Sequence, residues 1–139
     1  MGHEWMGIVE EVGAEVRTIK KGETVGYGAT WAATRPSRLA IIAVGYADGF
    51  LRSAGAAKQK TAADIIIGGK RCPLAGRVSM DLFAADVTDL PEGTVRRGDL
   101  ATLVGEGLSA DDLAAAMGTI GYEVLTGLGR RYHRIYKNA

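Results

Sequence analysis

Three segments of the chain place reactive side chains beside glycines, where a backbone turns sharply or approaches another part of the molecule closely. They read Val-Gly-Tyr-Gly-Ala-Thr at 25–30, Val-Gly-Tyr-Ala-Asp-Gly at 44–49 and Gly-Arg-Val-Ser-Met-Asp at 76–81. A phenol has a reference pKa of about 10, so a tyrosine is a useful base at neutral pH only beside cations that favour its phenolate. Taken singly, each segment also fits a structural role: Tyr27 and Tyr46 as aromatics at a barrel rim, Met80 as core filler, and Arg77 in a surface ion pair.

Together, in this order and with these gaps, the three segments resemble the C-terminal domain of alanine racemases. The resemblance extends from about Arg17 to the end of the chain. It implies an enzyme that uses pyridoxal phosphate and two bases on opposite faces of its substrate. A lysine in a separate α/β barrel would hold the cofactor and serve one face. A tyrosine from the C-terminal domain of the other subunit would serve the opposite face, and that tyrosine matches Tyr27.

The same resemblance assigns substrate-binding roles to five further residues. Tyr46 matches a second tyrosine that narrows the substrate entrance, and Met80 matches a residue whose amide and side chain meet the substrate carboxylate. Arg77, Asp81 and Arg52 match the polar lining of that entrance.

A cofactor contact is also expected near the C-terminus. Relatives often carry a tyrosine there that bonds the cofactor phosphate, and both Arg130 and Tyr132 stand near that position. The resemblance therefore leaves Tyr132 as one candidate phosphate ligand. Asp48 is expected to fix the loop that follows Tyr46.

The first residues of the chain resemble a different family. The run Gly-His-Glu-Trp-Met-Gly-Ile-Val-Glu-Glu-Val-Gly from residue 2 is similar to zinc-dependent medium-chain alcohol dehydrogenases, in which the histidine is a catalytic zinc ligand. Catalytic zinc needs about three protein ligands, and His3, Glu4 and the distant Cys72 do not supply such a set. We therefore expect structural or vestigial roles for His3 and Glu4, and no metal site.

These two resemblances divide the chain into a dehydrogenase-like strand segment, residues 1–16, and a racemase-like domain, residues 17–139. The pattern suggests a chimera with a junction between about Glu11 and Val25. A dehydrogenase hairpin would then replace the first strand of the racemase domain and enter the same fold, which requires that its alternation and register be kept.

Short segments rich in Val and Ile, separated by Gly, Pro and Asp, predict an all-β fold, a barrel or sandwich with one short helix near residues 109–120. The expected strands are Gly7–Val12, Arg17–Ile19, Thr24–Tyr27, Ser37–Val44, Ala63–Ile67, Lys70–Cys72, Gly76–Asp81, Leu82–Val87 and Leu100–Val104. Gly68 and Gly69 predict a tight hairpin. The helix is expected to begin after Ser109 and to end at Gly121, and Tyr122–Leu125 to begin a further strand.

The composition of the chain indicates which kinds of partner it can bind and in which cell compartment it is expected. A chain of 139 residues with 47% hydrophobic content suits one globular domain. Seventeen basic against sixteen acidic side chains give a net charge of +1, so no global field favours nucleic acid or membrane. The lone Cys72 excludes an internal disulfide, no signal-like segment opens the chain, and the apolar run 39–46 is only strand length. These features predict a cytoplasmic protein.

The expected function follows from what the chain carries. No barrel is present to bind pyridoxal phosphate, so we expect no bound cofactor and no activity from this chain alone. One alternative is that it contributes in trans to L-/D-alanine racemisation with a separate barrel chain, and another is a zinc-dependent dehydrogenase fragment. The expected partner is the barrel domain of another subunit. A homodimer is a second expectation, because the surface around Tyr27, Tyr46 and Met80 would be uncovered.

Overall fold

The structure, a computed structural model, describes residues 5–12, 18–25, 31–55, 62–129 and 131–132. Its strands are β1 (Trp5–Val12), β2 (Thr18–Ile19), β3 (Thr24–Val25), β4 (Trp31–Ala32), β5 (Ser37–Ile42), β6 (Asp64–Ile67), β7 (Lys70–Ala75), β8 (Phe83–Asp86) and β9 (Leu100–Val104). Its helices are the 3-10 turns η2 (Tyr46–Asp48) and η3 (Arg52–Ala54) and the α-helices α1 (Ala110–Met117) and α2 (Gly121–Thr126).

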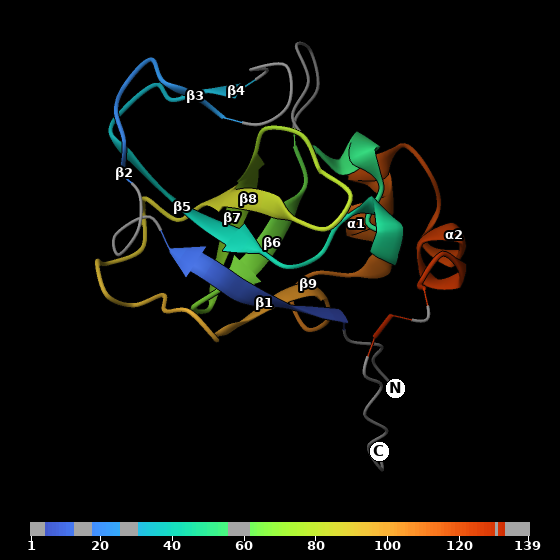
Figure 1. The fold of residues 1–139 in the computed structure, drawn as a ribbon. Helices are drawn as coiled ribbons and strands as arrows, with labels where there is room; N and C mark the ends of the chain where they lie inside the picture. Colours follow the sequence, from blue (N-terminus) through green and yellow to red (C-terminus); the bar gives the residue numbers. More distant parts are fainter. Residues whose placement is uncertain (1–4, 13–17, 26–30, 56–61, 130, 133–139) are drawn as a thin grey trace.

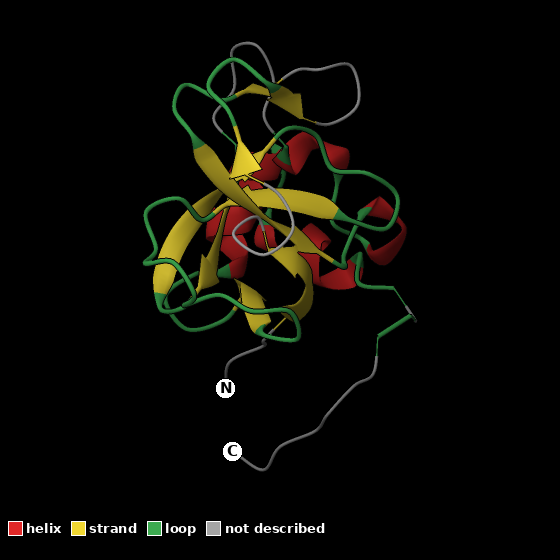
Figure 2. Cartoon of the chain, turned by 60° about the vertical axis from the view of Figure 1, so that its left-hand side comes forward, coloured by secondary structure: helices red, strands yellow, loops and turns green. Residues whose placement is uncertain are grey.

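A closed antiparallel sheet forms the centre of the domain. The described strands run in the order β1-β9-β6-β7-β8-β5-β2, and β1 also pairs with β5. This second pairing closes the sheet on itself into a barrel, which removes open edges. Figure 1 shows α1 and α2 together on one side of the barrel and the β3–β4 ribbon beyond one end. Figure 2 shows the strands crossing as they wrap around the core. The all-β prediction is confirmed.

Alternation along the strands fills the barrel interior. Ile65 and Ile67 of β6 are buried, whereas Ile66 between them is half-buried. Phe50 and Phe83 stack at the centre with ring centroids 4.7 Å apart. Each large side chain removed from water contributes about 1.5–3 kcal/mol. The core therefore holds together strands that are far apart in sequence.

The N-terminal strand belongs to this sheet. Strand β1 pairs with β9 through residues 5–8 and with β5 through residues 9–12, with register shifts between Trp5 and Met6 and between Val9 and Glu11. Gly7 is buried against the core, and a Cβ there would lie 2.6 Å from Cγ2 of Ile42. Strand β1 therefore closes the sheet between β9 and β5.

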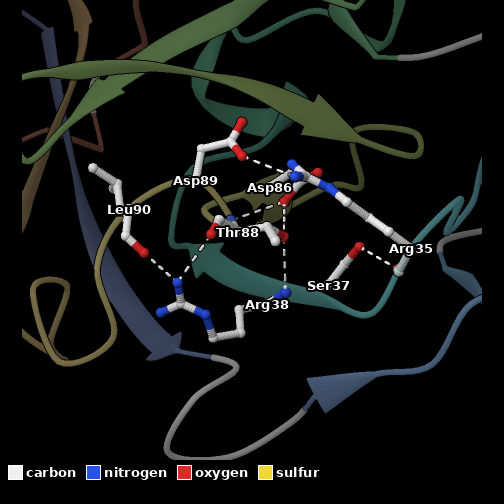
Figure 3. Close-up of polar contacts among 7 residues, drawn as sticks. All are labelled: Arg35, Ser37, Arg38, Asp86, Thr88, Asp89 and Leu90. Carbon is white, nitrogen blue, oxygen red and sulfur yellow. Dashed lines mark hydrogen bonds and ion pairs between the residues drawn. The ribbon is translucent and has the colours of Figure 1, made fainter.

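Polar contacts tie the start of β5 to the chain that follows β8. The backbone N–H of Arg38 donates to Oγ1 of Thr88 at 3.1 Å, and its guanidinium donates to the carbonyls of Thr88 and Leu90 (Figure 3). Arg35, just before the strand, forms an ion pair of 2.9 Å with Asp89. These bonds help to fix the register of β5 relative to β8.

Local turn signals were read correctly at two places. Gly68 and Gly69 have φ values of +61° and +78° and join β6 to β7, with Ile67 opposite Lys70. Ser109 caps α1: its hydroxyl accepts from the N–H of Asp112 at 3.1 Å, and the Asp112 carboxylate accepts from the N–H of Ser109 at 3.1 Å.

Other sequence predictions need correction. Helix α1 ends at Met117 because Gly118 takes the left-handed conformation that closes helices, and Gly121 begins α2 rather than ending α1. Residues 122–125 belong to α2, not to a strand, since the N–H groups of Glu123 and Val124 donate back to the carbonyl of Ile120.

Strand limits also differ from the prediction. The segment 76–81 is a loop, because its carbonyls accept hydrogen bonds from the η2 turn rather than from a strand. Strand β5 ends at Ile42, where the N–H of Val44 folds back to the carbonyl of Ile42 at 2.9 Å. Strand β7 continues to Ala75, and β4 was not predicted. Residues 17 and 26–27, which completed two expected strands, lie outside the described residues.

None of the helices within the described ranges is long and apolar enough to cross a membrane.

Candidate functional site

Two loops that carry predicted site residues leave the same end of the barrel. Strands β5 and β8 are antiparallel neighbours with Ile42 opposite Phe83, so the loop after β5 and the loop before β8 start side by side. Backbone hydrogen bonds then join them: the N–H of Tyr46 donates to the carbonyl of Ser79, and that of Ala47 to the carbonyl of Met80, both at 3.0 Å. The structure thus brings the second and third sequence motifs together.

Gly45 permits this close approach. A Cβ at Gly45 would overlap with the carbonyl oxygens of both Ser79 and Met80. The φ of Gly45 is −148°, an extended value that any residue can adopt, so space and not backbone strain requires glycine here. The first glycine of the Gly-Tyr-Ala-Asp-Gly run is therefore explained by the packing of one loop on the other.

Asp48 shapes the η2 turn from inside. It is only 6% exposed, and its Oδ2 accepts a hydrogen bond of 3.0 Å from the N–H of Gly45. Gly49 closes the turn with a φ of +97°, and its N–H donates to the carbonyl of Tyr46 at 3.2 Å. The expected role of Asp48 in fixing this loop agrees with these contacts.

The joined loops present two large side chains to the surface. Tyr46 is 42% exposed and Met80 is 53% exposed, although Tyr46 follows the largely buried strand β5 and Met80 precedes the largely buried strand β8. Their backbones are held by the barrel while their side chains project from it. Such an arrangement suits contact with a ligand or with another protein surface.

The predicted arginines lie on neighbouring segments. Arg52 begins η3 and Arg77 lies in the loop before β8, and both are exposed. Gly55, which follows η3, packs against this loop: a Cβ there would lie 2.9 Å from Cα of Arg77. The η3 segment and the Arg77 loop are therefore packed together, so Arg52 and Arg77 belong to the same end of the barrel as Tyr46 and Met80.

The sequence interpretation missed Arg131. Its Nη1 lies 2.9 Å from Oδ1 of Asp81, and its Nε lies 3.3 Å from Oδ1 of Asp48. The hydrogen bond to Asp81, and then the charge of Asp48, raise the pKa of Arg131 above its ordinary value. The sequence signal for this residue was the basic composition of residues 130–134, and this composition does not identify Asp48 and Asp81 as its partners.

Tyr132, the candidate phosphate ligand, has a partner within the chain. Its hydroxyl donates to the backbone carbonyl of Asp48, and the N–H of Gly129 approaches the same oxygen at 3.4 Å. This geometry holds the segment after α2 against the η2 turn, and Tyr132 stays a predicted phosphate ligand. The competing residue, Arg130, lies outside the described residues.

Two other groups of predicted residues also lie outside the described ranges. Tyr27, the predicted base, falls within residues 26–30, and His3 and Glu4 fall within residues 1–4. Among the residues that are described, no group of three His, Cys, Asp or Glu side chains could hold a metal ion.

Fold and site together define a class: a small antiparallel β-barrel domain that presents a loop-borne surface site at one end. The family model described as "Alanine racemase, C-terminal domain" matches residues 9–136, and this chain belongs to that family. The match begins within the segment assigned above to a dehydrogenase-like origin.

Individual relatives agree with this assignment. The chain is 50% identical over 122 residues to an alanine racemase of Methylobacterium sp. (strain 4-46), covering 88% of this chain and 32% of the relative. It is 48% identical over 123 residues to the biosynthetic alanine racemase of Pseudomonas aeruginosa, again covering 88% and 32%. The chain therefore spans about a third of the length of the curated relatives it matches.

Solved structures show the same fold. The crystal structure of biosynthetic alanine racemase from Pseudomonas aeruginosa superposes with a TM-score of 0.85 at 43% identity, covering 97% of this chain and 35% of that one. The alanine racemase from Bartonella henselae, solved with covalently bound pyridoxal phosphate, gives 0.84 at 34% identity, covering 96% and 34%. These relatives are alanine racemases and lend no support to a dehydrogenase-like origin of residues 1–16.

Proposed function

We propose that this chain supplies one side of the active site of an alanine racemase, which a barrel domain completes. Tyr27 serves as the base on one face of the substrate, and Tyr46 and Met80 contact the substrate. Arg77, Asp81 and Arg52 line its entrance. The observation that supports this proposal is the pairing of the Tyr46 and Met80 loops, which leaves both side chains exposed at one end of the barrel.

The proposed roles suit the chemistry of an amino-acid substrate. The exposed guanidinium groups of Arg52 and Arg77 favour a negatively charged carboxylate near the entrance. The phenol of Tyr27 needs neighbouring cations to act as a base at neutral pH, and the barrel of family members supplies them. Pyridoxal phosphate, which such barrels bind, stabilises negative charge on the substrate carbon when its proton is removed. We assign the binding of that cofactor to the barrel, because the lysine that would hold it belongs to the barrel of family members.

The proposed partner is therefore a barrel domain of another subunit. The relatives are about three times as long as this chain, which leaves room in them for that domain. We propose that the 139 residues alone do not racemise alanine, and that they contribute to catalysis only when a barrel domain is present.

Mixing experiments test this function. The chain, a separately expressed barrel domain with pyridoxal phosphate, and their mixture are assayed for conversion of L-alanine to D-alanine. Activity is expected only in the mixture, and Tyr27→Phe should lower it by about 100-fold or more, the usual contribution of a positioned base. Tyr122→Phe is the matched control, because Tyr122 is 80% exposed in α2 and has no assigned role. Equal activity of the Tyr27→Phe and wild-type mixtures would contradict the proposed base.

The dehydrogenase-like origin of residues 1–16, and with it the division at residue 17, stays a prediction. Measurement of bound zinc tests it directly: stoichiometric zinc in the purified chain would support a dehydrogenase-like site that includes His3. No contact among the described residues favours that second function.

A further inference from the structure

The two loops of the candidate site are held together by few backbone bonds. Within the described residues, the N–H groups of Tyr46 and Ala47 donate to the carbonyls of Ser79 and Met80. Both Tyr46 and Met80 are exposed, so contacts with the barrel core do not immobilise their side chains. A side chain that bonds both loops would restrict the separation of these two exposed side chains further.

Arg131 spans both loops with one rigid group. Its Nε faces Asp48 of the first loop at 3.3 Å, and its Nη1 faces Asp81 of the second at 2.9 Å. A guanidinium is planar and offers donors along separate edges, so it can bind two carboxylates in a fixed relative position. The side chain of Asp48 is only 8% exposed. A carboxylate that is so nearly buried needs a compensating charge.

The segment that carries Arg131 is itself fixed to the first loop. The N–H of Gly129 and the hydroxyl of Tyr132, on either side of Arg131, both donate to the carbonyl of Asp48. A Cβ at Gly49 would overlap with the carbonyl oxygen of Gly127, which shows how closely this segment approaches the turn. Arg131 therefore reaches the two aspartates from between two residues, Gly129 and Tyr132, that are both hydrogen-bonded to the η2 turn.

We infer that Arg131 is a positioning residue that clamps the Tyr46 loop to the Met80 loop through Asp48 and Asp81. The clamp sets the distance between the two exposed side chains. The consequence for specificity rests on the proposed function. The distance between the two side chains fixes the width of the substrate entrance, and this width sets the preference for alanine over larger amino acids.

Amide hydrogen exchange of the 139-residue chain, followed by NMR, tests the clamp without any assay of activity. Arg131→Gln should speed exchange at the amides of Tyr46 and Ala47 by roughly fivefold, the effect of losing about one partly exposed charged contact. The core amides of β5 should keep their rates. Arg131→Lys should give an intermediate effect, because an ammonium cannot hold two carboxylates in a fixed fork.

Arg35→Gln is the matched control. It also removes an exposed arginine from an ion pair of 2.9 Å, with Asp89, but at the start of β5 (Figure 3). It should leave the amides of Tyr46 and Ala47 unchanged. The clamp is refuted if these amides exchange in Arg131→Gln as in the wild type. It is equally refuted if all amides accelerate together, which would indicate global destabilisation.

The consequence for specificity is measured in the chain mixed with its barrel domain. Arg131→Gln should raise KM for alanine by roughly fivefold with a smaller change in kcat, and should lower the preference for alanine over serine. A fall in kcat with unchanged KM and preference would overturn the positioning role. If the wild-type mixture is inactive, the proposed function fails, while the exchange experiment still decides whether the clamp exists.

Discussion

The backbone N–H of Tyr46 lies 3.0 Å from the carbonyl oxygen of Ser79, and the residue before Tyr46 has no room for a side chain. This contact joins two loops that lie more than 30 residues apart in the sequence. Any group added at Gly45 must separate them.

Gly45→Ala should therefore destabilise the domain by roughly 2–4 kcal/mol, because its Cβ would overlap with two backbone carbonyls that cannot move independently. Urea unfolding gives the free energy. Gly129→Ala is the control, because its Cβ would be 3.6 Å from the nearest atom, the carbonyl oxygen of Ala47. This variant also keeps the backbone N–H that donates to the carbonyl of Asp48. A Gly45→Ala domain as stable as the control would show that the loops are not packed as described.

Ser109→Ala should cost about 1 kcal/mol, since it removes the acceptor for the N–H of Asp112 in the first turn of α1. Urea unfolding again gives the change. Ser109→Asp retains an acceptor at the cap and should recover most of the loss. If both variants unfold alike, the cap does not stabilise α1.

Sequence patterns predicted the parts of the fold that depend on neighbouring residues. The Gly68-Gly69 hairpin and the Ser109 cap each arise from a few adjacent residues with particular backbone or side-chain properties. The closure of the barrel by β1, by contrast, depends on pairings with β5 and β9 that no local pattern contains.

The candidate site was also predictable only in part from the sequence. Motif resemblance selected Tyr46 and Met80, and the structure places them on joined loops. The prediction of a strand at 76–81 was wrong, because the carbonyls of Ser79 and Met80 accept hydrogen bonds from the η2 turn rather than from a neighbouring strand. Arg131 was missed because Asp81, its closer partner, is 50 residues away along the chain.

Asp112 should make the stability of the domain depend on pH in the acid range. The N–H of Ser109, and then its hydroxyl, lower the pKa of Asp112 in the folded state. A lowered pKa stabilises the fold above the unfolded value of about 4, and this contribution is lost as the pH falls through the folded value. Asp112→Asn should therefore lose stability at neutral pH and less, or none, at about pH 2. A constant difference between the two proteins over that range would contradict the assignment.

Cys72 should give the opposite dependence in the alkaline range. Burial, and then the charge of Asp86, raise the pKa of the Cys72 thiol to about 11. The unfolded thiol ionises at a pKa of about 8.5. The stabilising contribution of the neutral thiol is therefore complete below that value and is lost as the pH rises through the folded pKa.

Other groups also ionise in this range, so the measurement compares the wild type with Cys72→Ala. The wild type should lose more stability than the variant between about pH 8 and pH 11, because only the wild type has a thiol that ionises more readily when unfolded. A thiol reagent at pH 8 should correspondingly modify the native protein far more slowly than the urea-unfolded chain, since the thiolate is the reactive form. Equal rates would mean that Cys72 is open to solvent, which its 3% exposure in the barrel core contradicts.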